Sequence, residues 1–153
     1  MRVWRIAHVR HAVFDGEGAR LYGSRWTRKG IPAVFASATL SLAALERFVH
    51  TDSDIEGIDL AAIGMDIDAS VGIDHMGVDD LPRDWRVYPA PYALTAVGDR
   101  WLRAGRAAVL SIPSVVIPHE RNFIINPLHR SVARLVPQVV ERFSFDPRMW
   151  KKP

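Results

Sequence analysis

The alternation of apolar and polar residues along the chain predicts more strands than helices. Residues 2–7 (RVWRIA) alternate apolar and basic side chains, which is typical of a strand. Further short β-rich runs lie at residues 31–36, 61–68, 107–117 (two runs broken at Pro113), 122–125 and 139–145. Because these runs are not regularly interleaved with helices, the pattern predicts an α+β fold with mixed or antiparallel sheets and a few helices, not a doubly wound parallel sheet.

The clearest helical pattern covers residues 39–50. Apolar residues recur there at helical spacing, at Leu42, Leu45 and Val49. Ser37 or Thr39 can cap this helix. On the helical wheel Glu46 lies at the edge of the apolar face, one turn after Leu42, whereas Arg47 points to the outer side.

A second helix is predicted at residues 95–104, with Val97 and Trp101 facing inward and Gly105 ending it. Residues 51–60 form a polar link, and residues 81–86 (LPRDWR) form a turn with an aromatic anchor. The acidic stretch 66–80 is similar to a calcium loop, but Val71 and Gly77 stand where a glycine and a bidentate glutamate are needed. We expect a solvated loop there.

Composition suits one compact domain covering residues 1–153, since the chain has 153 residues and 48% hydrophobic content. The start, MRVWRIAHVRH, is not a signal peptide, and the most apolar stretch, 107–118, is too short to span a bilayer. The cytoplasm is therefore the default location, with no membrane association. The absence of cysteine excludes disulfides, thiol catalysis and cysteine metal sites.

Residues 14–26 form a loop rich in glycine and arginine, in which Arg20 and Arg25 flank Tyr22. A carboxylate at the edge of a core, with arginines arriving from a loop, suits an anionic substrate. The Gly16-x-Gly18 pair lacks the third glycine of a dinucleotide fingerprint, and no helix opens on it. The pair His8 and His11 lacks the surroundings of a metalloprotease motif, so we expect no metal site.

These segments together resemble the RES domain family. The matching pieces are GARLYGSRW around Arg25, FASATLSLAALE ending in Glu46, PSVVIP with Ser114, NFIINPLH with Asn126, and FSFDPR. They follow the family's order over nearly the whole chain. Ser24 stands where the family usually has a second glycine, and Phe35 where it usually has a tyrosine. Phe35 keeps a ring for stacking.

The resemblance implies a toxin of a toxin–antitoxin pair with a fold like the ADP-ribosyltransferases and with NAD as its substrate. Family members degrade NAD by phosphorolysis or hydrolysis, with inorganic phosphate as a co-substrate in the first case, or transfer ADP-ribose to a protein. The implied partner is an antitoxin with a helix-turn-helix (Xre-like) part that binds DNA, forming a hetero-oligomer with a toxin that does not itself bind DNA.

Breaking the nicotinamide–ribose bond gives an oxocarbenium-like transition state, which a carboxylate can stabilise. The resemblance assigns that role to Glu46, phosphate binding to Arg25 and Arg5, and stacking on nicotinamide to Phe35. Neutral hydrogen bonds to NAD would come from Ser37, Ser114 and Asn126.

On the residues alone, Glu46 fits a surface glutamate paired with an arginine, and Ser114 fits a turn serine. A function of another class also remains open, a basic RNA-binding or ribonuclease-like module, since the chain has five tryptophans and a net charge of +3. The sequence shows no RNA-binding motif or clustered basic stripe that would favour it.

Overall fold

One mixed sheet organises the fold in the computed structural model, which describes residues 1–11, 13–51, 59–135 and 137–150. Within these residues the sheet has seven strands in the order β4-β5-β6-β2-β1-β3-β7. The strands are β1 (Arg2–His8), β2 (Val34–Ser37), β3 (Leu60–Asp66), β4 (Ile73–His75), β5 (Val109–Pro113), β6 (Arg121–Ile125) and β7 (Pro137–Phe143). The β4–β5 pair is parallel and the other neighbours are antiparallel, so the predicted α+β class is confirmed.

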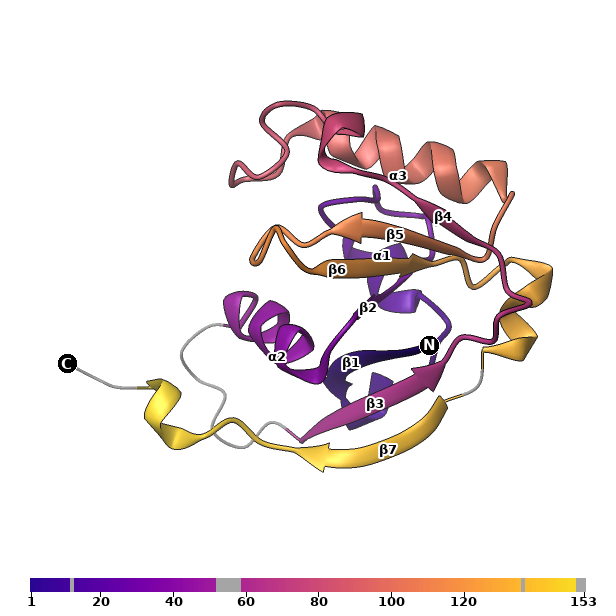
Figure 1. Ribbon diagram of the computed structural model, residues 1–153. Coiled ribbons are helices and arrows are strands. Elements are labelled where there is room, and N and C mark those ends of the chain that lie inside the picture. The colour runs from indigo at the N-terminus through magenta and orange to yellow at the C-terminus, as the bar shows by residue number, and fades with distance from the viewer. Residues whose placement is uncertain (12, 52–58, 136, 151–153) are drawn as a thin grey trace.

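The sheet is nearly divided where β1 meets β2. Their pairing is limited to Trp4 and Ser37, whereas β1 and β3 pair from Arg2–Asp66 through to His8–Leu60. Figure 1 shows β1, β3 and β7 forming one half and β4, β5 and β6 the other. The largest buried cluster takes side chains from both halves, among them Val3, Met65, Val109, Phe123 and Ile125. The two halves therefore pack against each other.

Helix α2 (Leu40–Val49) covers β1 and β2. The Thr39 side chain accepts a hydrogen bond from the Leu42 amide and so caps the helix, as predicted. Leu42 and Ala43 are buried, and Ala43 packs against the sheet with Ile6, Leu60 and Ala62. The prediction for Arg47 is wrong, because its side chain is half-buried and its Nε is fully buried.

Helix α3 (Tyr92–Ala104) begins three residues earlier than predicted and ends at Gly105, which adopts the left-handed φ of 56°. Its buried face consists of Leu94, Gly98, Asp99 and Leu102, not the predicted Val97 and Trp101. Trp101 is half-buried instead, and its indole Nε1 donates to Asp74 Oδ2 at 2.7 Å, which holds the ring beside β4. None of the helices in the described ranges is long and apolar enough to cross a membrane.

The remaining elements are short: α1 (Glu17–Tyr22) and the 3₁₀ turns η1 (Val9–His11), η2 (Val78–Asp80), η3 (Arg130–Arg134) and η4 (Pro147–Trp150). The predicted loop 66–80 in fact contains β4, which pairs with β5 although the two strands are distant in the chain. The strand predicted after Pro113 does not form, because the amides of Val116 and Ile117 bond the Ser114 hydroxyl. Most of the predicted polar link, residues 52–58, lies outside the described residues.

Candidate functional site

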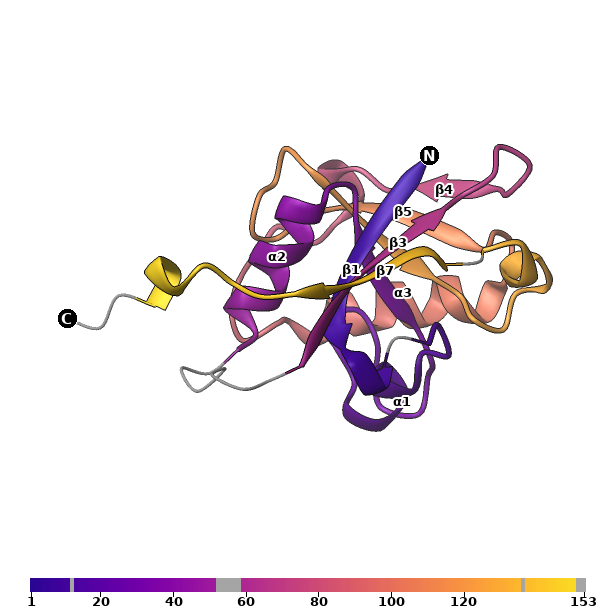
Figure 2. The same cartoon turned by 90° about the horizontal axis from the view of Figure 1, so that it is seen from below.

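A carboxylate held by two side chains lies where α2 meets the β5–β6 connection. Glu46 Oε1 accepts hydrogen bonds from Ser114 Oγ at 2.7 Å and from Asn122 Nδ2 at 2.5 Å. The helix and the connection lie side by side in both views (Figure 1 and Figure 2). Among the described residues no hydrogen bond is made by the second oxygen, Oε2, so the carboxylate is anchored through one oxygen and open at the other.

The Ser114 hydroxyl acts as the hydrogen-bond donor in its contact with Glu46. Ser114 is fully buried, and its Oγ accepts from the Val116 amide at 3.1 Å and the Ile117 amide at 3.0 Å. Because these contacts occupy both lone pairs, the hydroxyl hydrogen is left for Glu46. Ser114 is therefore a turn serine, as the residues alone suggested, and at the same time a donor to the carboxylate.

Asn122 is the site residue that the sequence did not reveal. It lies on β6 opposite Ser37 of β2, and Ser37 Oγ donates to Asn122 Oδ1 at 2.8 Å. This contact leaves the amide nitrogen of Asn122 to donate to Glu46. The signal available in the sequence was an amide side chain at the start of a strand predicted to be apolar. The structure thus brings Ser114 directly to Glu46 and links Ser37 to Glu46 through Asn122.

Arg25 enters from the loop that follows α1. Its Nη1 donates to the backbone carbonyls of Trp85 and Val87, each at 3.0 Å. Burial lowers the pKa of Arg25, and the negative charge of Glu46 opposes that shift, so the two groups lie within electrostatic range. Since both donated bonds use Nη1, Nε and Nη2 make no hydrogen bond with the described residues.

The loop that carries Arg25 is held by hydrogen bonds within the loop and by contacts with α3. Ser24 Oγ accepts from the Trp26 amide at 3.1 Å and the Thr27 amide at 3.0 Å, so the serine at the family's glycine position closes a tight turn. A Cβ on Gly98 of α3 would lie 2.0 Å from the Trp26 carbonyl oxygen. The buried Asp99 accepts from Arg28 N at 3.1 Å and Arg28 Nε at 2.5 Å. The backbone on either side of Arg25 is therefore immobilised.

Phe35 lies on the same side of β2 as Ser37, since the two are separated by one residue. It is half-buried and packs against a cluster that includes Trp26, Leu110 and Ile124. Phe35 is therefore only partly buried, on the side of the sheet that Ser37 and Asn122 share.

Arg5 and Asn126 are not brought into contact with Glu46. Arg5 Nη1 donates to the Val13 carbonyl at 3.3 Å, and its guanidinium lies 5.9 Å from the centre of the Phe14 ring. Asn126 follows the far end of β6 and is buried. Its Nδ2 donates to the Leu102 carbonyl and its Oδ1 accepts from the Leu128 amide, both at 3.0 Å. These contacts join α3 to the turn after β6.

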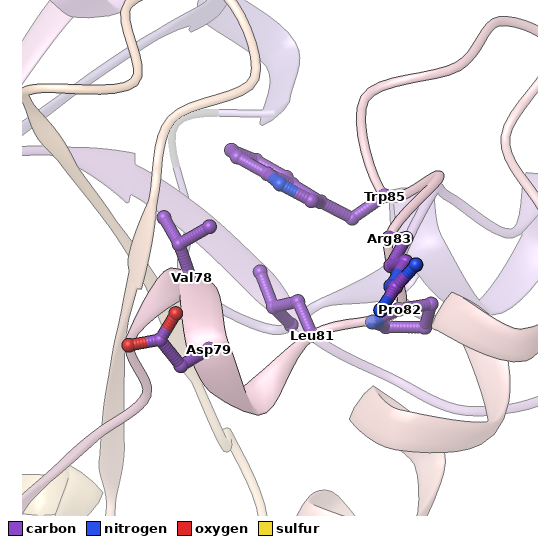
Figure 3. Close-up of a pocket in the computed structure, with 6 residues that line it drawn as sticks. All are labelled: Val78, Asp79, Leu81, Pro82, Arg83 and Trp85. Atoms are coloured by element: carbon purple, nitrogen blue, oxygen red, sulfur yellow. The ribbon is translucent and has the colours of Figure 1, made fainter.

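A surface hollow of about 320 Å³ lies between η2 and the turn that follows it. Figure 3 shows Val78, Leu81 and the ring of Trp85 reaching toward one another, with Arg83 apart beside Pro82. None of the predicted site residues lines this hollow. Trp85 connects this hollow to the site. Its side chain is buried, and its backbone carbonyl accepts a hydrogen bond from Arg25.

The arrangement suits a substrate that carries anionic groups and develops positive charge during reaction. The open oxygen of Glu46 can stabilise a cationic centre, and the remaining N–H groups of Arg25 can bind phosphate oxygens. Phe35, which is only partly buried, offers an aromatic ring of the kind that stacks on a planar group.

Comparison with known proteins gives consistent matches over almost the whole chain. The model of the family described as RES domain matches residues 2–147. A protein named Toxin Res from Photorhabdus laumondii is 36% identical over 145 residues, which is 94% of this chain and 90% of that protein. A protein named Prs ADP-ribosylating toxin from Sphingobium sp. is 33% identical over 159 residues, covering 97% and 96% of the two chains.

A solved structure shares the fold. A chain in the crystal structure of the M. tuberculosis MbcT-MbcA toxin-antitoxin complex superposes with a TM-score of 0.76 at 13% identity, covering 97% of this chain and 86% of that one. The architecture implied by the sequence resemblance is therefore confirmed.

Proposed function

Because the chain belongs to the RES domain family, we propose that it is a toxin of a toxin–antitoxin pair that consumes NAD by cleaving the nicotinamide–ribose bond. Attack on the ribose by inorganic phosphate or by water would complete the reaction, and the proposal requires no metal ion. It places the protein in the cytoplasm, where NAD is used.

The observation that carries this proposal is the carboxylate of Glu46, held at Oε1 and open at Oε2. Loss of nicotinamide from NAD leaves positive charge on the ribose, and a fixed carboxylate lowers the energy of that transition state without having to reorganise. Arg25 supplies N–H groups for the diphosphate, and Phe35 supplies a ring for the nicotinamide. Ser37, Ser114 and Asn122 act by positioning Glu46.

The proposal is tested by proton NMR of nicotinamide released from NAD, in phosphate and in phosphate-free buffer. Glu46→Gln keeps the shape and the acceptor oxygen but removes the charge, so we expect release to fall by about 10²–10³-fold. Glu141→Gln, on the exposed part of β7, removes the same charge away from the site and should behave as wild type. Release that needs phosphate would identify a phosphorylase.

The proposal would be contradicted if wild-type protein, freed from any partner, left NAD intact in both buffers. Equal release by wild type and Glu46→Gln would remove Glu46 from the mechanism while leaving the reaction in place.

Transfer of ADP-ribose to a specific protein is the second candidate, favoured by the name of the Sphingobium relative, Prs ADP-ribosylating toxin. The same bond breaks, and the acceptor is a protein side chain instead of water or phosphate. Labelled NAD incubated with a cell lysate should then mark a discrete protein band. If no lysate protein is marked while the purified protein releases nicotinamide, NAD consumption without transfer to a protein is the remaining function.

An antitoxin partner follows from the proposed toxicity, and a solved structure with this fold, that of MbcT-MbcA, is a toxin-antitoxin complex. We expect the partner to carry an Xre-like helix-turn-helix part that binds DNA, to block the NAD site and to form a hetero-oligomer with this chain. DNA binding should reside in the partner and not in the toxin.

A further inference from the structure

The backbone turn that holds Arg25 is built around Arg86. Arg25 Nη1 donates to the carbonyls of the residues on either side of Arg86, Trp85 and Val87, each at 3.0 Å. The turn, residues 84–87, is closed by a hydrogen bond of 2.9 Å from the Val87 amide to the Asp84 carbonyl. Because the two acceptors flank one residue, a displacement of Arg86 would carry both of them, and Arg25 with them.

The side chain of Arg86 reaches the segment that holds Glu46. Arg86 Nε donates to the Val115 carbonyl at 3.2 Å. Val115 directly follows Ser114, whose hydroxyl donates to Glu46 at 2.7 Å. Among the hydrogen bonds of the described residues, the Arg86 bond alone joins the 84–87 turn to the β5–β6 connection. Val115 also packs against the apolar cluster that contains Trp85, but apolar contacts have no preferred direction.

The β5–β6 connection is tied to α2 at both of its ends. Ser114 bonds Glu46 near the end of the helix, and the hydroxyl of the helix cap, Thr39, donates to Glu120 Oε2 at 3.2 Å. The connection is closed on itself by the Ser114 amide, which donates to the Glu120 carbonyl at 2.9 Å. The connection is therefore held in place on the helix that carries the carboxylate, and Arg86 joins this unit to the turn that carries Arg25.

We propose that Arg86 is a positioning residue that sets the separation between the Arg25 guanidinium and the Glu46 carboxylate. The inference goes beyond the proposed function and rests on it for the reaction. Cleavage of NAD requires the two groups to engage one substrate at the same time, and a misplacement of about 1 Å can lower a rate by about 100-fold. Arg86 acts through the backbone of the 84–87 turn and of the connection, without touching the substrate.

The link is measured first by amide hydrogen exchange followed by NMR, which needs no substrate. The amides of Val116 and Ile117 report on the connection, because both bond Ser114 Oγ. We expect their exchange to be faster by about tenfold in Arg86→Gln, and closer to wild type in Arg86→Lys, which keeps a donor and the charge. Arg83→Gln is the charge-matched control, at an exposed arginine that lines the surface hollow (Figure 3).

The steady-state kinetics of nicotinamide release are then measured on the same variants. We expect kcat of Arg86→Gln to fall by about tenfold with KM close to wild type, since Arg25 and Glu46 remain present but are displaced relative to each other. Ser114→Ala already removes the bond from the connection to Glu46. In that background Arg86→Gln should therefore have a smaller effect on kcat.

Unchanged exchange of the two amides in Arg86→Gln would overturn the inference, as would faster exchange with the kcat of wild type. An equal loss of kcat with and without Ser114 would also overturn it, because Arg86 would then act by another route. A merely structural role would lower the Tm of Arg86→Gln below that of Arg83→Gln and leave kcat per folded molecule unchanged. If exchange depends on Arg86 but wild type releases no nicotinamide, the proposed function fails while the link between the two segments stands.

Discussion

At the scale of single residues, Ser114 serves both the fold and the carboxylate. Ser114→Ala removes the donor to Glu46 and leaves the Val116 and Ile117 amides without their acceptor. We expect a loss of about 1–3 kcal/mol in unfolding free energy, and nicotinamide release lower by about tenfold. Urea unfolding and the NMR assay measure the two effects. Ser144→Ala, at an exposed serine, is the control, and the same stability for both variants would contradict the hydrogen-bond assignment.

The sequence alone predicted part of this candidate site. Glu46, Ser114 and Arg25 were proposed because their segments resemble a family, and the structure brings Ser114 into contact with Glu46 and Arg25 near it. Asn122 was missed because its role depends on the register that sets it opposite Ser37, and register is decided by strands distant in the chain. Asn126 shows the opposite difficulty: the sequence indicates a polar group next to a strand but not that Leu102 and Leu128 use up its amide.

At the scale of elements, α3 acts as a support for the loop that carries Arg25. Gly98→Ala would drive a methyl group into the Trp26 carbonyl, so we expect a loss of about 1–3 kcal/mol in stability from overpacking, and weaker nicotinamide release. Gly18→Ala is the matched control, because no atom lies within 4 Å of the added Cβ and alanine favours the α1 helix. Thermal melting and the NMR assay compare them. If the Gly98→Ala protein is as stable and active as wild type, α3 does not support the Arg25 loop in this way.

Elements with strong local patterns were predicted well, and those that depend on a distant partner were not. The α2 helix and its Thr39 cap follow from apolar spacing and a hydroxyl. The strand β4 has three residues and exists through its parallel pairing with β5, which periodicity cannot reveal. The buried face of α3 was predicted wrongly because Gly98 faces inward. Gly98 fits there since it has no side chain to clash with Trp26, and the spacing of hydrophobic residues does not indicate such a position.

At the scale of the whole molecule, a bidentate ion pair ties the start of β1 to the end of β3. Arg2 donates to Asp66 through Nε and Nη2, each at 2.8 Å, and this bonding holds the pKa of Asp66 below its ordinary value. A carboxyl with a lowered folded pKa adds stability above its ordinary pKa of about 4, and the contribution is lost as pH falls through the folded value.

Wild type should therefore lose Tm between pH 5 and pH 3, and Asp66→Asn should lose less over the same interval. Thermal melts at several pH values, in low salt, measure this difference. Asp79→Asn, at an exposed aspartate of η2 without an ion pair in the described part of the chain, should follow the wild-type curve. Parallel curves for wild type and Asp66→Asn would show that the pair contributes nothing.

The order of strands in the sheet also determines when the site is completed during synthesis. Glu46 is made early, whereas Ser114 and Asn122 follow only with β5 and β6, which insert next to strands already present. A chain still on the ribosome can pair β1, β2 and β3 and fold α2, yet its carboxylate has neither donor. At about 5–20 residues per second, this state lasts for several seconds of translation. On the proposed function, the growing polypeptide would be unable to consume NAD within that interval.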